Sequence, residues 1–181
     1  MDKVLPFIAI GAVVALGIVL HTGRTPTPEL QVVEELDLER YMGVWYEIAS
    51  IPASFQRRCV SDTTATYTLR DDGSVEVANA CRRTDGRILE ARGRAWPGDA
   101  PAKLRVSFAV VFGIPLFTAP YWVIDLAPDY SYAVVGHPSR EYGWVLAREP
   151  ELPEEHLAAI FDRLAKQGYD PANFRRTEHT G

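Results

Sequence analysis

The sequence predicts an all-β domain: an eight-stranded up-and-down antiparallel barrel with one C-terminal helix packed outside, preceded by an N-terminal hydrophobic helix. Residues 43–148 form a series of short alternating segments broken by turn residues, a pattern typical of sandwiches and barrels. Counting from "VWYEIAS" gives eight strands in simple order, and eight antiparallel strands can close around one small ligand. A two-sheet sandwich is the alternative that this pattern leaves open.

The N-terminal segment differs from the rest of the chain. Residues 4–20, "VLPFIAIGAVVALGIVL", carry no charge, and their number lies between the core of a signal peptide and a short membrane span. A buried core helix would normally have a polar face, and this run has none. We therefore expect a signal peptide or membrane anchor over residues 1–22, a Pro-containing linker over 23–35 and the barrel domain over 36–181. No cysteine ends the run, so a lipid-modified N-terminus has no attachment residue.

The first strand, in "GVWYEIASIP", places Trp45 and Glu47 on one alternating face. A barrel with a closed floor and a lined interior would explain why a large aromatic and a carboxylate point the same way. A buried carboxylate must find hydrogen-bond donors or stay protonated. Glu47 therefore either meets a ligand or is paired internally with an Arg or Tyr.

The next segments show the alternation of half-buried strands. "VSDTTATYTL" and "SVEVANAC" are joined by residues 71–73, a three-residue hairpin loop that ends in glycine. In "RILEARGRAW" the inward set is small, which leaves space inside; it comprises Leu89, Ala91, Gly93 and Ala95. "KLRVSF", "PYWVIDL", "YSYAVVG" and "YGWVLAR" complete the strands.

A helix is expected after the last strand. Pro153 suits its first turn, beside two glutamates that are favourable at a helix N-terminus. Gly168 suits its C-terminal end. One apolar stripe, which should pack on the outer barrel wall, is formed by Leu157, Ile160, Phe161 and Leu164.

The two cysteines flank the predicted hairpin. An even count in an exported domain favours one disulfide between Cys59 and Cys81, and two buried thiols are the alternative. Ideal pairing across the turn would put Cys59 opposite residue 85. A bridge therefore requires a bulge or a diagonal link from loop to strand near the barrel mouth.

Several classes of function are disfavoured by the sequence. The net charge is −5 and no basic run is present, so nucleic acid is not an expected partner. The histidines have no metal-ligand spacing, and neither a phosphate-binding loop nor a nucleophile elbow occurs. We expect no catalytic residue, no metal and no cofactor; nothing indicates an oligomeric state.

Three motifs resemble those of the lipocalin family, over roughly residues 36–179. Residues 43–45 resemble the Gly-x-Trp signature of its first strand, residues 125–130 occupy the place of the second signature, and residues 144–148 resemble the third, which ends in arginine. The likeness is strongest to the branch of bacterial lipocalins and apolipoprotein D. By this resemblance, Trp45 closes the barrel floor, Arg148 lies across its ring in a cation–π stack, and Gly43 permits the tight turn before the strand.

The resemblance implies a non-enzymatic protein that binds and transports a hydrophobic small molecule, such as a fatty acid, lysophospholipid or similar lipid. We expect it in the bacterial cell envelope, in the periplasm, either free or anchored to the membrane by residues 4–20. A lipocalin-fold isomerase acting through a cysteine, which a disulfide would preclude, and a ligand-free interaction domain with a solid interior are the alternatives. Besides Glu47, alternation places on the cavity wall Ala49, Tyr67, Val77, Phe108, Trp122 and Ile124; closed core packing is the other interpretation of each.

Residues 109–120, "AVVFGIPLFTAP", form an uncharged loop between the fifth and sixth strands. Loops normally run over the surface and are polar, so an apolar loop needs a reason. We expect it at the open end, opposite Trp45, as a lid or as a lip that helps collect lipid from a membrane. Extra strand length buried against a neighbour is the alternative.

Overall fold

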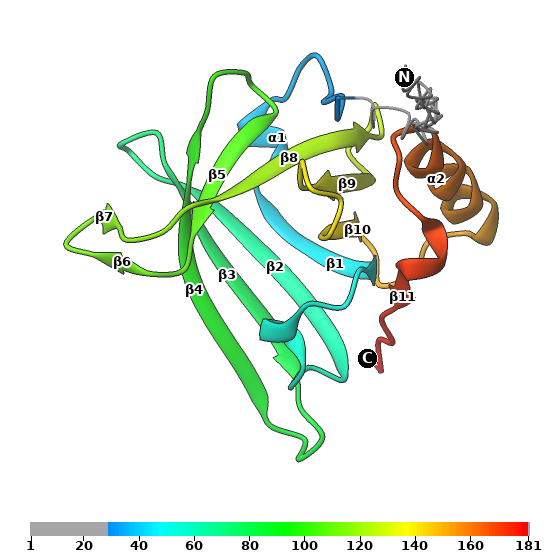
Figure 1. Ribbon diagram of the computed structural model, residues 1–181. Coiled ribbons are helices and arrows are strands. Elements are labelled where there is room, and N and C mark those ends of the chain that lie inside the picture. The colour runs from blue at the N-terminus through cyan, green and yellow to red at the C-terminus, as the bar shows by residue number, and fades with distance from the viewer. Residues whose placement is uncertain (1–28, 181) are drawn as a thin grey trace, which may run out of the picture.

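A closed barrel of eight antiparallel strands forms the centre of the computed structural model, which describes residues 29–180 (Figure 1). Each strand pairs with the next in the chain, and β10 pairs with β1 to close the ring. The predicted barrel is thus confirmed, and the sandwich is not formed. The barrel strands are β1 (Gly43–Ser50), β2 (Ser61–Leu69), β3 (Val75–Arg82), β4 (Ile88–Pro97), β5 (Lys103–Ser107), β8 (Ala119–Leu126), β9 (Tyr132–Gly136) and β10 (Gly143–Ala147).

Because the strands run up and down in order, successive connections lie alternately at the two ends of the barrel. Four loops lie at the end where β1 finishes: residues 51–60, 83–87, 108–118 and 137–142. The first carries the 3-10 turn η1 (Ser54–Gln56), and the third carries a separate hairpin of β6 (Val110–Val111) and β7 (Ile114–Pro115). The opposite end holds the tight turns and a short helix, α1 (Leu38–Tyr41). We call these the open end and the closed end.

Helix α1 was not predicted from the sequence. Asp37 caps it, because its side chain accepts hydrogen bonds from the backbone N–H groups of Glu39 and Arg40 at 2.9 and 3.2 Å. Four residues carry no helical periodicity that a pattern search could detect. The helix places the buried Tyr41 ring beneath the strands.

The C-terminal helix α2 (Glu154–Lys166) lies against the outside of the barrel, as predicted (Figure 1). Gly168 follows it with a φ of +85°, a left-handed conformation that glycine adopts without steric cost. Arg163 on the helix forms an ion pair with Asp125 on β8 at 2.7 Å. The 3-10 turn η2 (Pro171–Asn173) and the short strand β11 (Arg175–Arg176), which pairs with β1, complete the chain. The helix and the barrel wall share a second, outer core that includes Leu157, Ile160 and Leu164 with Ile48, Val134 and Val145.

Residues 29–35 are packed against the barrel, although the linker was expected to extend to residue 35. Leu30 is buried in the outer core, and the backbone N–H of Val33 donates to the carbonyl of Val123 at 3.0 Å. The Pro-containing polar stretch that suggested a linker, "HTGRTPTPE", ends at residue 29. The signal peptide or anchor predicted for residues 1–22 lies outside the described residues. None of the helices within residues 29–180 has the length and apolar character needed to cross a bilayer.

Candidate functional site

The closed end is sealed by Trp45, whose side chain is fully buried. Its indole N–H donates to the Tyr41 carbonyl on α1 at 2.8 Å. The Arg148 guanidinium lies 3.8 Å from the centre of the Trp45 ring. This is the cation–π stack expected for the barrel floor.

Arg148 also ties the entering chain to the barrel. Its guanidinium donates to the carbonyl oxygens of Val44, Arg40 and Met42 at 2.8, 2.7 and 2.8 Å. Gly43 has a φ of +95°, and a Cβ added there would lie 3.4 Å from Arg148 Nη1. The turn before β1 therefore suits glycine for its backbone conformation, whereas the contact of an added Cβ with the guanidinium would be an ordinary one.

Three tyrosine hydroxyls meet above this floor. Tyr121 is hydrogen-bonded to Tyr41 at 2.9 Å and to Tyr67 at 2.8 Å. Burial raises the pKa of Tyr67 to about 12 and those of Tyr41 and Tyr121 well above the usual value. Three hydroxyls share two hydrogen bonds, so one of their three protons has no partner within the cluster.

Above the tyrosines the barrel encloses a cavity of about 690 Å³, within the range of roughly 300–1,000 Å³ common for small-molecule sites. Its opening lies among the open-end loops, which contribute Phe55, His137 and Tyr142 to its lining. A solid interior, which a ligand-free domain would have, is therefore absent. Most of the wall is apolar and includes Ala65, Val77, Leu89, Val106, Val135 and Leu146.

Small residues on β4 make room for this cavity, as the sequence indicated. Ala91 lines it directly. At Gly93 a Cβ would lie 2.5 Å from the Ser107 carbonyl oxygen and 2.8 Å from Cδ1 of Phe108. Because Gly93 lacks that carbon, the Phe108 ring can lie against β4 and become part of the cavity wall.

Four of the predicted ligand-binding residues line the cavity, namely Glu47, Tyr67, Val77 and Phe108. The expected placement of Ala49 was wrong. The pairing of β1 with β10 shifts between Glu47 and Ala49, which is a β-bulge. Ala49 therefore lies opposite Val145 and packs in the outer core instead of the cavity.

The expected placement of Trp122 and Ile124 on the cavity wall was also wrong. The inward residues of β8 are Tyr121 and Val123, which belong to the barrel core. Ile124 is buried in the outer core, and the Trp122 ring lies 4.4 Å from Lys103 Nζ. Both faces of β8 are covered and apolar, so alternation alone could not show which face points inward.

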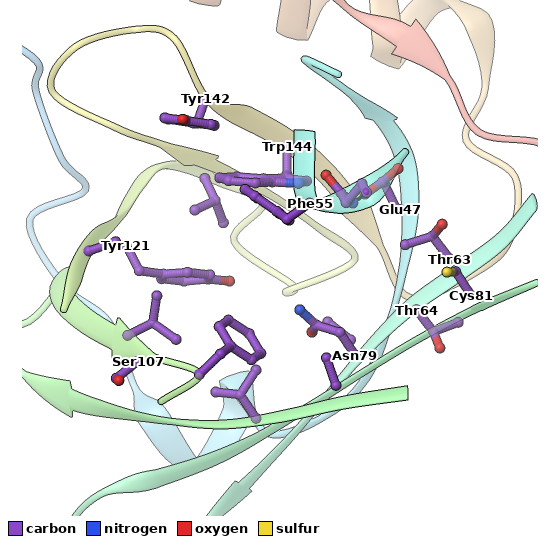
Figure 2. A pocket seen from close by; sticks show the side chains of 18 of the residues that line it. Glu47, Phe55, Thr63, Thr64, Asn79, Cys81, Ser107, Tyr121, Tyr142 and Trp144 are labelled. Carbon is purple, nitrogen blue, oxygen red and sulfur yellow. Dashed lines mark hydrogen bonds between the residues drawn. The ribbon is translucent and has the colours of Figure 1, made fainter. Parts of the chain in front are cut away.

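Glu47 lies at the cavity wall and is almost fully buried. Its carboxylate accepts hydrogen bonds from Ser50 Oγ at 3.0 Å, Gln56 Nε2 at 3.0 Å and Thr177 Oγ1 at 2.6 Å. The internal pairing left open by the sequence is therefore with hydroxyls and an amide, not with an Arg or Tyr. Figure 2 shows Glu47 at the edge of the cavity, close to Phe55 and Trp144 in that view.

A stack of three aromatic rings lies near the opening. Tyr142 is stacked on Trp144, with ring centres 6.3 Å apart, and on Phe55 at 6.2 Å. Sequence reasoning missed this group because the rings come from a loop at residue 55 and from β10 and its preceding loop. Only the closure of β10 on β1 brings them together.

Cys59 and Cys81 form a disulfide with a Cα–Cα distance of 5.5 Å. Cys59 lies in the loop before β2, and Cys81 lies on β3. The pairing of β2 with β3 shifts between Ser61 and Thr64, so the bridge joins a loop to a strand beside an irregularity of the hairpin, and both features that the sequence offered as alternatives are present. Both cysteines of the chain are used, and no free thiol remains.

The uncharged loop projects from the open end as the β6–β7 hairpin (Figure 1). Phe112 and Gly113 at its tip have φ values of +49° and +80°, as in the two-residue turns that usually contain Asn or Gly. Phe112 is fully exposed, and Phe117, at the base of the hairpin, is exposed but also lines the cavity. The alternative of a strand buried against a neighbour is therefore not observed.

Within residues 29–180, no cluster of three His, Cys, Asp or Glu side chains is placed to hold a metal ion.

The family model described as "Lipocalin-like domain" matches residues 36–179. Temperature-induced lipocalin-1 of Arabidopsis thaliana is 40% identical over 157 residues, covering 84% of each chain. Outer membrane lipoprotein Blc of Escherichia coli K12 is 36% identical over 182 residues, covering 99% of each. Mouse apolipoprotein D is 36% identical over 170 residues, which are 87% of this chain and 84% of that protein.

Solved structures show the same fold at lower identity. Insecticyanin from the tobacco hornworm Manduca sexta superposes with a TM-score of 0.66 and 21% identity, covering 84% of this chain and 86% of that one. A major allergen from cockroaches gives a TM-score of 0.65 at 17% identity and covers 82% and 91% of the two chains. At this level of identity the likeness concerns the barrel architecture alone.

Proposed function

Because this chain belongs to the lipocalin family, we propose that it is a non-enzymatic carrier of a single-chain lipid, such as a fatty acid, lysophospholipid or similar molecule. The observation that carries the proposal is the cavity, which is open at one end and lined mainly by apolar side chains. Each CH₂ group moved from water into such a site contributes about 0.8 kcal/mol. An alkyl chain can therefore be held without a covalent bond or a metal.

The chemistry of the cavity supports binding without catalysis. The lipocalin-fold enzyme considered above would use a cysteine nucleophile, and both cysteines are joined in the disulfide. The polar side chains on the wall include Glu47 and Asn79. The hydroxyls that contact Glu47 belong to Ser50 and Thr177, which are not among the described residues lining the cavity, so this contact does not present an activated hydroxyl nucleophile to a ligand.

The disulfide also supports a place outside the cytoplasm, and we propose that this place is the bacterial cell envelope. The printed name of the Escherichia coli relative describes an outer membrane lipoprotein. No cysteine stands directly after the apolar N-terminal run of this chain. We therefore propose attachment, where it occurs, through residues 4–20 themselves.

Filling the cavity tests the proposal. Ala91→Trp places a large ring in the open space beside β4, whereas Glu90→Trp adds the same ring on the exposed outer face of the same strand. We expect Ala91→Trp to weaken the binding of a fluorescent fatty-chain probe at least tenfold and Glu90→Trp to leave it near the wild-type value. If neither variant alters the titration, the probe does not occupy the barrel and the proposal fails.

The exposed hairpin gives the proposed carrier a means of contacting a lipid surface. Its apolar side chains lie beside the opening, and Phe117 belongs to both the hairpin surface and the cavity wall. A ligand leaving a membrane at this point would pass from one apolar surface to another without crossing water. We propose that the hairpin collects lipid in this way.

A further inference from the structure

The small polar part of the cavity wall includes hydrogen-bond acceptors and, among the described residues, no permanent cation. No Lys or Arg is among the described residues that line it. Glu47 receives hydrogen bonds only from neutral groups, and it forms no ion pair within residues 29–180. His137 lines the opening, but burial lowers its pKa and favours the neutral ring.

A second acceptor beside the carboxylate has no donor. Gln56 is oriented by its Nε2, which donates to Glu47 Oε2 at 3.0 Å, and its Oε1 is buried without a hydrogen-bond partner. Oδ1 of Asn79, on β3, is buried and unpartnered as well. Figure 2 shows the Asn79 side chain pointing into the cavity. Buried acceptors without donors are costly, so a ligand that supplies N–H donors would satisfy groups that the protein leaves open.

Aromatic rings lie next to these acceptors. Glu47 on β1 pairs with Leu146 on β10, and Trp144 is the next inward residue along β10, on the side of the open end. Phe55 precedes Gln56 in the chain and belongs to the aromatic stack of the mouth. The faces of such rings attract ammonium groups, most strongly when the contact is desolvated. A carboxylate, an open amide oxygen and aromatic faces therefore meet at one place in the upper cavity.

From this arrangement we propose that the cavity selects single-chain amphiphiles with a cationic head, an ammonium or trimethylammonium group. The head lies against Glu47, Gln56 and the ring of Trp144, where an ammonium head also donates N–H to the open Gln56 oxygen and a trimethylammonium head makes the charge and ring contacts alone. The alkyl chain extends toward Tyr67 and Tyr121. A carboxylate or sulfate head would instead bring a second negative charge beside Glu47 with no cation to compensate it. This inference rests on the proposed function and narrows its ligand class.

A matched set of ligands tests the preference for a cationic head separately from the carrier function. Titration calorimetry with dodecyltrimethylammonium, dodecylamine, dodecanol and dodecanoate, each below its micelle concentration, compares heads on one chain. We expect both cationic ligands to bind about tenfold more tightly than dodecanol, which corresponds to about 1.4 kcal/mol, and dodecanoate to bind most weakly. If all four bind equally, or dodecanoate binds best, the head-group inference is wrong and the carrier function stands. If none binds, the carrier function fails with it.

Variants then test whether Glu47 and Gln56 cause the preference for a cationic head. Glu47→Gln should reduce the ratio of ammonium to alcohol affinity to about one, whereas Glu141→Gln, in a rim loop and not part of the cavity wall, should keep the wild-type ratio. Gln56→Lys, which places a cation beside Glu47, should invert the order so that dodecanoate binds better than the ammonium. It also serves as the test should Glu47→Gln not fold. A cation preference that survives in folded Glu47→Gln or Gln56→Lys protein would overturn the assignment.

Discussion

The two ends of the barrel differ in how completely their side chains are buried and hydrogen-bonded within the chain. At the closed end, Trp45 is fully buried and hydrogen-bonded, and Arg148 combines its ring contact with three backbone hydrogen bonds. At the open end, Phe112 and Phe117 face solvent and Gln56 Oε1 is buried without a partner. The closed end gains stability from complete contacts within the chain. The open end leaves contacts for other molecules, and this division between stability and function can be tested end by end.

The largest effect is expected at the floor. Trp45→Ala should destabilise the fold by about 3–5 kcal/mol, because a large buried ring is lost, and Arg148→Ala should also destabilise it. The double variant should cost less than the sum, since both substitutions remove the same stack. Urea denaturation of the four proteins gives the coupling energy. The matched cycle of Arg148→Ala with Trp122→Ala, whose ring lies outside the barrel, should be additive; additivity in both cycles would rule out the stacking contribution.

The next effect concerns the disulfide, which fixes the open-end loop of residues 51–60 to β3. Replacing both Cys59 and Cys81 by Ala should lower the unfolding free energy by about 3 kcal/mol, the entropy estimate for a loop of this length. Thermal melts with and without reductant provide the measurement. Reductant should lower the melting temperature of the wild type and leave that of the double variant unchanged. If reductant lowered the melting temperature of both proteins equally, the disulfide would not be the cause of the difference in stability.

The third effect is the response of the tyrosine cluster to alkaline pH. The native state keeps the Tyr67 proton up to a pKa of about 12, while the unfolded chain releases it near its usual pKa of about 10. The unfolded state therefore binds fewer protons between these values, and stability is complete below pH 10 and falls as pH rises through this window. The slope should be about 1.4 kcal/mol per pH unit for this residue. Urea melts at several pH values should show a shallower slope for Tyr67→Phe, and an unchanged slope would contradict the assignment.

The smallest effect on stability is expected at the hairpin. Replacing Phe112 and Leu116 by Ser should alter the unfolding free energy by no more than about 0.5 kcal/mol, because both side chains are exposed. The same change should slow the uptake of a fluorescent lipid from phosphatidylcholine vesicles several-fold. Val44→Ser, at an exposed apolar position of the closed end, is the matched control and should leave uptake unchanged. A collapsed melt with normal uptake by the folded fraction would show that the hairpin residues are structural.

The sequence was most informative where local pattern and local structure coincide. Gly43, Trp45 and Arg148 lie in short motifs whose residues contact one another, and the small inward residues of β4 indicated a hollow interior. Prediction failed where a single backbone irregularity reverses the inward and outward alternation of side chains along a strand. The bulge after Glu47 turns Ala49 outward. It failed also at Trp122, because β8 is apolar on both faces.

Groups assembled from distant strands were not predictable from one sequence. The Tyr41, Tyr67 and Tyr121 hydroxyls come from α1, β2 and β8. The partners of Glu47 include Thr177, 130 positions away in the chain. Such contacts depend on barrel closure and on the return of the C-terminal segment along β1, neither of which leaves a periodic signal in the sequence.

The outer core beneath α2 has a consequence for how this protein can change. The strands β1, β8, β9 and β10 are held from behind by buried side chains that never face the cavity, such as Val134, Val145 and Ile160. Substitutions on the inner face of these strands therefore leave that support in place, and their effects on folding and on ligand choice are largely separable. A scaffold built in this way can acquire a new specificity through a few interior replacements without first acquiring extra stability, which makes it a suitable starting point for directed evolution of binding.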